Sequence, residues 1–213
     1  MIYRTNDKQG DNYMKNYLCI NGKKIELTAE QVKKLIQEEV ALSDFNIGDS
    51  FKIGDYEFIV LEQQGDETMC ILKELYENNV MFGAIDNDYR NSIVKKKCDR
   101  FAEDLESLVG DGNLLEYELD LISADGLTDY KKINVKAAPL TQAQYQKYVC
   151  ILDKERVEKW HWLSTPLSTK LHGCDTSVCC VSPSGIIFCV NLFNYFNIGV
   201  RPFCIFKSSI FVS

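Results

Sequence analysis

The C-terminal stretch Leu171–Phe206, LHGCDTSVCCVSPSGIIFCVNLFNYFNIGVRPFCIF, decides the fold. Its 36 residues contain no Lys, Glu, Gln, Met or Trp, although these five types fill 47 of the first 170 positions. None of the five has a codon that ends in a pyrimidine. The stretch is what would remain if many codons were scrambled at their first two bases while the third stayed T or C, as in adenine-directed mutagenesis of asparagine codons. Burial in a sheet is the alternative explanation, because buried strands are poor in Lys, Glu and Gln.

Charge is unevenly distributed along the chain. Residues 1–170 carry 22 basic and 30 acidic groups, whereas the remainder carries only Arg201, Lys207 and Asp175. An acidic body lacks the basic face that phosphate contact needs, so we expect no nucleic-acid partner. The one basic run, Lys95–Lys97, is expected to be a solvated helix face. No apolar run approaches the ~18 residues of a membrane span, so we also expect no such span.

The cysteines favour a reducing compartment. There are nine, an odd number in a large chain, and the polar segment Met1–Lys15 lacks the apolar core of a signal peptide. We therefore expect synthesis in the cytoplasm without a signal peptide, and free thiols. Five of the nine fall in the biased stretch, where random pyrimidine-ending codons would enrich cysteine: Cys174, Cys179, Cys180, Cys189 and Cys204.

Residues 1–45 are predicted to form a small N-terminal unit. Tyr17–Leu27 has the pattern of a hairpin, with Asn21-Gly22 supplying a type I′ turn. A helix should follow, with Thr28 as its N-cap and Gln31 completing a capping box. A unit this small cannot hold a core of its own, so we expect it to dock on the body or to mediate a homo-oligomer.

The main domain is predicted to span residues 46–213 and to be of the α+β class. Phe51–Leu61 should form a hairpin and Thr68–Leu72 a third strand. A helix should run between an N-cap at Ser92 and a stop at Gly110, and a short helix with a second capping box should occupy Thr141–Tyr148. The buried face of the longer helix is expected to consist of residues at helical spacing: Val94, Cys98, Phe101, Leu105 and Leu108. Only strand and loop signals come after these helices.

Three short sequence motifs, taken in order along the chain, resemble those of a known domain family. Gly48-Asp49 with Phe51 opens the domain, Trp160–Pro166 reads Trp-His-Trp-Leu-Ser-Thr-Pro, and Gly199–Pro202 reads Gly-Val-Arg-Pro. With these motifs the chain resembles, over about residues 46–206, a family of bacterial and phage domains of unassigned function that is common in Bacillota. It departs from the family at His161, which separates two tryptophans that the family has adjacent.

The closing motifs are also similar to those of the C-type lectin-like fold shared by formylglycine-generating enzymes and the variable proteins of diversity-generating retroelements. The resemblance implies a C-type lectin-like domain of the formylglycine-generating-enzyme type, with a diversified segment at about 165–206. It implies a non-enzymatic receptor for a protein or cell-surface ligand, associated with a virion or a bacterial surface. The expected ligand-facing residues are His172, Cys174, Ser177, Cys179, Phe188, Asn191, Phe193, Asn194, Tyr195 and Phe196.

Other residues of the stretch are expected to support this surface. Trp162 should belong to the core, and Arg201 should pair with a buried carboxylate or carbonyl. The remaining scaffold residues are expected to be Val178, Val181, Gly185, Val190, Gly199, Val200, Pro202 and Ile205.

The sequence gives little support for a metal site. The calcium-binding motifs of lectins, Glu-Pro-Asn and Trp-Asn-Asp, are not in the sequence, and Asp86–Asp88 is expected to be a solvated turn. Cys179 and Cys180 should point to opposite faces of a strand, which disfavours a copper pair. A zinc site of His172, Cys174 and one of these two cysteines has no recognised spacing. We expect no cofactor; an undiversified structural or interaction module of the same family is the second hypothesis and a metal-dependent enzyme the third.

Overall fold

The computed structural model describes residues 2–5, 15–20, 23–28, 40–193 and 197–212. The chain divides into an N-terminal unit, Met1–Val40 with Ser213, and a main unit, Ala41–Val212. The main unit begins before residue 46, where the sequence placed the boundary. The reason is Leu42, which is fully buried and whose backbone N–H donates to the Ile210 carbonyl at 2.8 Å.

The N-terminal unit contains an antiparallel sheet in the order β1-β2-β3. Its strands are β1 (Ile2–Thr5), β2 (Lys15–Ile20) and β3 (Lys23–Leu27). The predicted hairpin is confirmed, because β2 and β3 pair directly, whereas β1 was not predicted. The Asn21-Gly22 turn and the helix expected after Thr28 lie outside the described residues.

The larger sheet of the main unit has six strands in the order β11-β16-β7-β6-β5, with β8 also pairing to β16. The predicted hairpin and third strand are confirmed as three of its members. Its strands are β5 (Ser50–Ile53), β6 (Tyr56–Gln64), β7 (Glu67–Leu72), β8 (Leu114–Leu115), β11 (Ala137–Ala138) and β16 (Phe203–Lys207). The last strand, β16, lies inside the sheet beside β7, where Phe203 pairs with Ile71.

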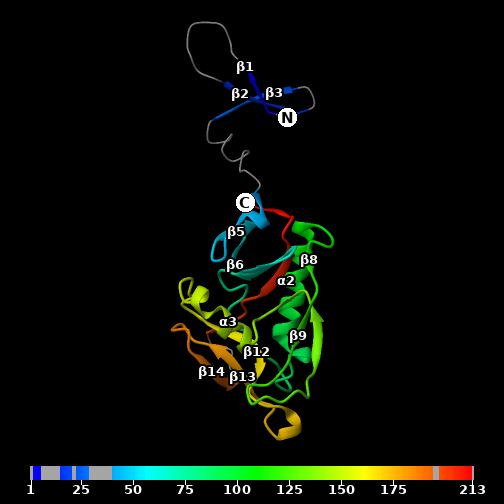
Figure 1. The fold of residues 1–213 in the computed structure, drawn as a ribbon, viewed down its shortest axis with the longest axis vertical. Coiled ribbons are helices and arrows are strands. Elements are labelled where there is room, and N and C mark those ends of the chain that lie inside the picture. Colours follow the sequence, from blue (N-terminus) through cyan, green and yellow to red (C-terminus); the bar gives the residue numbers. More distant parts are fainter. Residues whose placement is uncertain (1, 6–14, 21–22, 29–39, 194–196, 213) are drawn as a thin grey trace. The chain divides into compact units, whose positions relative to one another are not determined.

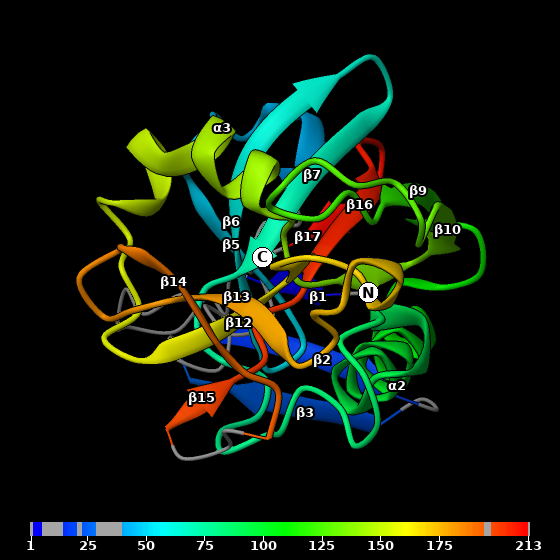
Figure 2. The same cartoon turned by 90° about the horizontal axis from the view of Figure 1, so that it is seen from below.

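Two helices cover this sheet from opposite sides, α2 (Ile93–Val109) and α3 (Gln142–Leu152) (Figure 2). Side chains alternate between the faces of a strand, and the two cores follow that alternation. Phe58 and Val60 pack in the cluster that holds the buried face of α2, whereas Ile59 and Leu61 pack in the cluster that holds α3. The sheet is therefore buried on both faces.

Local signals correctly predicted both ends of α2 and the start of α3, whereas α3 continues to Leu152, beyond the predicted end at Tyr148. The Ser92 hydroxyl accepts the Lys95 N–H at 2.9 Å, Gly110 is the C-cap of α2, and Thr141 opens α3 with a complete capping box. The prediction that Leu108 is buried is wrong, because this side chain is 53% exposed. It stands in the last turn of α2 beside the tight turn at Gly54, where a Cβ would lie 3.1 Å from it, and not over the sheet.

A second sheet of the main unit has the order β14-β13-β12-β15. Its strands are β12 (Trp160–Pro166), β13 (Ser177–Val181), β14 (Ile187–Asn191) and β15 (Ile198–Gly199). Strand β12 is antiparallel to β13 and parallel to β15. In this sheet β13 has a neighbour on each side, whereas β14 is an edge strand (Figure 1).

Short elements complete the described part of the chain. Two further strand pairs are present, β9 (Tyr117–Asp120) with β10 (Lys132–Val135) and β4 (Val40–Ala41) with β17 (Phe211–Val212). The short 3-10 helices are η1 (Leu42–Asp44), η2 (Tyr89–Asn91) and η3 (Lys170–His172). The α+β class is confirmed: the described residues form mostly sheet with two α-helices. None of these helices has the length and apolar character to cross a membrane.

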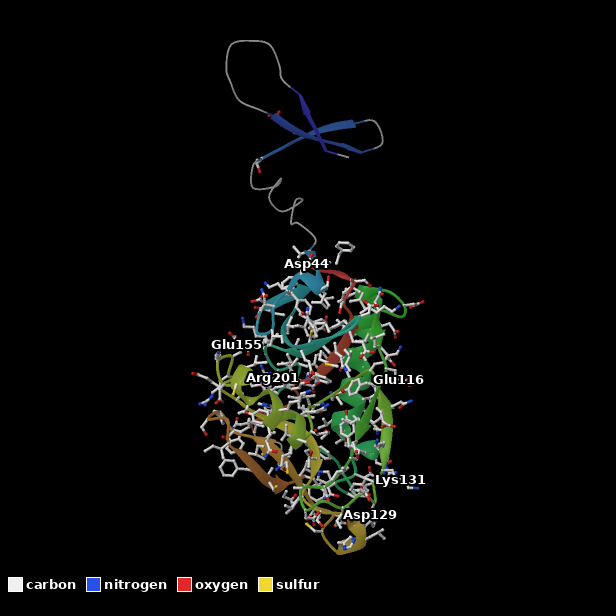
Figure 3. All side chains as sticks on the ribbon, viewed as in Figure 1. Asp44, Glu116, Asp129, Lys131, Glu155 and Arg201 are labelled. Atoms are coloured by element: carbon white, nitrogen blue, oxygen red, sulfur yellow. The ribbon has the colours of Figure 1, made fainter. Side chains whose placement is uncertain are left out.

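Val200–Pro202 carries the chain from the second sheet into the first. Here Arg201 is 2% exposed and lies in the interior of the main unit (Figure 3). Its guanidinium donates from Nε to the Leu72 carbonyl at 2.8 Å and from Nη2 to the Lys73 carbonyl at 3.1 Å and the Glu155 carbonyl at 3.4 Å. The expected pairing of Arg201 with a buried carbonyl is confirmed. Burial lowers the pKa of Arg201 to about 10, so the guanidinium remains charged at neutral pH.

Most of the other expected scaffold residues are buried. At Gly199 a side chain is excluded, because a Cβ would lie 2.5 Å from the Glu77 carbonyl oxygen. Gly185 and Val190 are only half-buried, since both belong to the hairpin that ends the second sheet. The fully supported predictions are Val178, Val181, Gly199, Val200, Pro202 and Ile205.

Trp162 is the largest fully buried side chain. Its indole N–H donates to the Val80 carbonyl at 2.6 Å, and its ring meets Phe82 edge-on at 5.6 Å between centroids. The position of Trp162 in the core is confirmed.

We predict that Trp162→Ala lowers the free energy of unfolding by about 3–5 kcal/mol, measured by urea denaturation. Trp160→Ala is the matched control, because Trp160 lies on the same face of β12 but is only half-buried. The Trp160→Ala substitution should lower the free energy of unfolding by clearly less than Trp162→Ala. Equal losses for the two variants would contradict the assignment of Trp162 as the core residue of this strand.

Candidate binding surface

The β13–β14 hairpin separates the biased stretch into a buried strand and an exposed one. In β13, the residues Val178–Val181 are all buried because β12 and β14 flank the strand and both of its faces are covered. Strand β14 has only β13 beside it, and its residues are exposed or half-buried. The stretch therefore contributes both to the core and to the surface.

The exposed side of this hairpin is apolar and aromatic. Ile186 is 56% exposed, Phe188 45% and Phe193 47%. Phe188 is directly opposite Cys180, which is opposite Trp162, so these side chains share one face of the sheet. On that face the Phe188 ring lies 5.3 Å from the half-buried ring of Trp160. We call Trp160, Ile186, Phe188 and Phe193 the hairpin apolar set.

Charged residues are nearly missing from the stretch that forms this hairpin. Between residues 171 and 206 the only charged residues are Asp175 and Arg201, and Arg201 is buried. Edge strands usually carry charged side chains that prevent pairing with other chains. Strand β14, with the sequence IFCVN, carries none. An apolar, uncharged edge suits contact with another macromolecule.

Asn87 fixes the loop that leads into the hairpin. Its amide nitrogen donates to the carbonyls of Ser168 at 3.0 Å, Cys174 at 3.2 Å and Ser177 at 2.9 Å, so its two hydrogens serve three acceptors. Its carbonyl oxygen accepts the Tyr130 hydroxyl at 2.7 Å. One buried side chain therefore determines the path of residues 168–177.

The expectation of a solvated turn at Asp86–Asp88 is wrong. Asn87 is fully buried for the reason just given, and Asp88 is 4% exposed. The Asp88 carboxylate is compensated by Arg90, whose Nε lies 2.9 Å from each carboxylate oxygen. This segment is a structural anchor and not a solvated loop.

The two histidines occupy opposite environments. His161 is 5% exposed, and burial, together with the charge of Arg201, lowers its pKa to about 3. It is therefore neutral in the folded protein at ordinary pH. His172 is exposed, and its Nε2 lies 3.7 Å from the Asp129 carboxylate, which also accepts the Thr169 hydroxyl.

The predicted ligand-facing residues do not form one group. Phe188, Asn191 and Phe193 are exposed on or beside β14, whereas His172 is exposed on the loop at η3. Cys174 and Ser177 are half-buried. Cys179 is fully buried, so its placement on the surface is wrong: β13 is covered on both faces. Asn194, Tyr195 and Phe196 lie outside the described residues.

Sequence reasoning missed two residues of this surface, Trp160 and Ile186. Trp160 could have been found from its spacing, because it lies two positions from the buried Trp162 and so points to the same face of the strand. Ile186 could not, since either set of alternating residues in Ile186–Val190 was compatible with the sequence.

The described part of the chain contains no metal centre built from protein side chains. No group of three or more His, Cys, Asp or Glu side chains is arranged there to hold a metal ion, so His172 and Cys174, which were disfavoured as zinc ligands, belong to no such group. A cavity of about 320 Å³ lies between β9 and α3. Its lining has one carboxylate, Asp120, with Thr141, Gln142 and other uncharged residues.

Comparison of the chain with models of protein families, with curated proteins and with solved structures gives no match. The functional argument therefore depends on the composition and the geometry of the chain itself.

We predict that Asn87→Asp lowers the free energy of unfolding by about 3 kcal/mol or more. A carboxylate has the same shape but cannot donate to the three carbonyls. Those of Ser168 and Cys174 would lose this hydrogen bond, and that of Ser177 would keep only the Leu167 N–H. Asn91→Asp, at an exposed position of η2, is the control and should change stability by less than about 0.5 kcal/mol. Urea denaturation of the three proteins measures both effects; a tolerated Asn87→Asp would show that the loop does not depend on this side chain.

Proposed function

We propose that this protein is a non-catalytic receptor with a C-type lectin-like domain, whose β14 edge and adjoining loop bind a protein or cell-surface ligand. We further propose that a diversity-generating retroelement varies this surface. Display on a virion or a bacterial surface would suit such a receptor.

The observation that carries the proposal is the composition of the exposed positions. Twelve of the described residues between 171 and 206 are exposed, and none of them is Lys, Glu or Gln. Burial explains the lack of Lys, Glu and Gln in β13 and in Phe203–Phe206 of β16, but it cannot explain their lack at positions that face water. Scrambling of codons with a retained pyrimidine at the third base accounts for both groups of positions.

The division of the hairpin into a buried strand and an exposed strand also supports this function. A diversified receptor has to change its contact surface without losing its fold. Three members of the hairpin apolar set have large aromatic rings, which give contact area at low cost in conformational entropy, as in antibody binding sites. Beside β14 in the same sheet lie the buried residues of β13, on a scaffold held by the hydrogen bonds of Asn87 and Arg201.

The neighbouring DNA tests diversification directly. We predict a reverse transcriptase gene and a near-copy of codons 165–206 that differs from them only where the near-copy has adenine. A near-copy that differs at other bases would contradict the proposal. If no near-copy exists, the second hypothesis, an undiversified interaction module, replaces it.

The proposal also predicts how the stretch tolerates substitution. Replacing Phe188 and Phe193 with Ser should lower the free energy of unfolding by about 1 kcal/mol or less for each residue, because both are about half exposed. The matched control replaces Phe203 and Phe206, which are buried in β16, and each substitution should cost about 3–5 kcal/mol. Guanidinium denaturation distinguishes the two pairs. Similar losses would mean that the β14 side is core, and the binding surface would have to be withdrawn.

A further inference from the structure

Cys179 and Cys189 face each other across the hairpin. They are directly opposite in the pairing of β13 with β14, and their sulfur atoms lie 3.1 Å apart. Neither is part of a disulfide. The contact brings two thiols together at the boundary between the core and the surface.

The hydrogen-bond pattern between β13 and β14 places this cysteine pair at a position that is favourable for a disulfide. Hydrogen bonds from Leu192 N–H to the Thr176 carbonyl (2.8 Å) and from Ser182 N–H to the Ile186 carbonyl (2.9 Å) identify the hydrogen-bonded pairs at the two ends of the hairpin. Hydrogen-bonded and non-hydrogen-bonded pairs alternate, so 179/189 is non-hydrogen-bonded, with a Cα separation of about 4.5 Å. Disulfides span Cα separations of about 4.4–6.8 Å.

The two thiols differ in access. Cys189 is exposed on the edge strand, whereas Cys179 is fully buried and has the Gln142 side-chain carbonyl 3.6 Å from its sulfur. Burial raises the pKa of the Cys179 thiol, and the neighbouring Cys189 adds to the shift. A reagent from solution can therefore reach only Cys189, and Cys179 is placed to react second.

We propose that Cys179 and Cys189 are a redox-active dithiol that reacts with low-molecular-weight disulfides, with Cys189 attacking first and Cys179 resolving the mixed disulfide. In the first step the Cys189 thiolate bonds to one sulfur of the reagent and breaks its S–S bond, releasing one thiolate. In the second step the Cys179 thiolate bonds to the Cys189 sulfur and releases the other. The protein loses two protons and two electrons, and the reagent becomes two thiols.

A second pair of cysteines also lies directly opposite across two strands, but it differs from Cys179 and Cys189 in its access to solvent. Cys70 and Cys204 are partners across β7 and β16, but both are fully buried. The Leu72 N–H to Pro202 carbonyl bond (2.9 Å) places them at a hydrogen-bonded pair, where the Cα atoms lie about 5.5 Å apart. No reagent can reach either sulfur in the folded protein, so this pair should remain reduced.

The disulfide would covalently join the exposed edge strand β14 to the buried strand β13 beside it. This inference is independent of the ligand and of diversification, because it depends only on the hairpin pairing. It concerns the folded chain under oxidation and leaves the expectation of free thiols in a reducing compartment unchanged.

The test treats the reduced full-length protein with oxidised glutathione, followed by denaturation and alkylation of all remaining thiols. Mass spectrometry should show one intramolecular disulfide, with Cys179 and Cys189 unalkylated and the other cysteines alkylated. Cys150→Ser, which removes an exposed cysteine elsewhere, should behave like the unchanged protein. Cys179→Ser should retain a glutathione on Cys189, and Cys189→Ser should form no intramolecular disulfide.

Three results would overturn the proposal. One is a protein that stays fully reduced under oxidised glutathione. Another is a stable mixed disulfide on Cys189 in the unchanged protein with no internal bond. The last is a disulfide in Cys189→Ser that uses Cys179 with another cysteine, since that would mean the hairpin pairing does not direct the reaction.

Discussion

The rest of the structure depends on the burial of one charged side chain where the chain passes between two sheets. Arg201 can be buried only because three backbone carbonyls, from Leu72, Lys73 and Glu155, accept its hydrogen bonds. These acceptors come from the end of β7 and from the segment after α3, so the guanidinium holds three distant parts of the chain in one place. With Gly199 pressed against the Glu77 carbonyl, the strands on either side, β15 and β16, have little freedom to shift. The second sheet, and with it the hairpin, takes its position from this crossing.

The same stretch of sequence meets two different constraints in neighbouring strands. In β13 each side chain has to fit between two neighbours, so small or branched apolar residues and cysteines fill it. In β14 only the side towards β13 is constrained. A strand at the edge of a sheet can thus vary widely while its neighbour keeps the fold. This physical asymmetry makes a hairpin a suitable carrier of a changing surface.

Local signals in the sequence predicted local structure well. The caps at Ser92 and Thr141 and the hairpins of β2–β3 and β5–β6 depend on residues a few positions apart. The candidate surface was predicted only in part, because exposure depends on neighbours that are remote in the sequence. The local sequence predicts that Asn87 is solvated, yet its carbonyl acceptors lie 81 to 90 positions further along the chain. The burial of Cys179 depends on which strand lies at the edge of the sheet, and the local sequence does not specify this. The two-residue strands β8 and β11 have no periodicity that a sequence could show.

The position of β16 inside the larger sheet has a consequence for synthesis on the ribosome. Strands β5, β6 and β7 are made early, but the strand that completes them follows much later, as the 129 positions between Leu72 and Arg201 indicate. At about 5–20 residues per second, the ribosome needs roughly 6–26 s to cover that distance. During this time β7 has an unpaired edge of apolar residues, including Cys70 and Ile71. The nascent chain therefore has an interval in which a chaperone, or a second nascent chain, can compete for the place that β16 later takes.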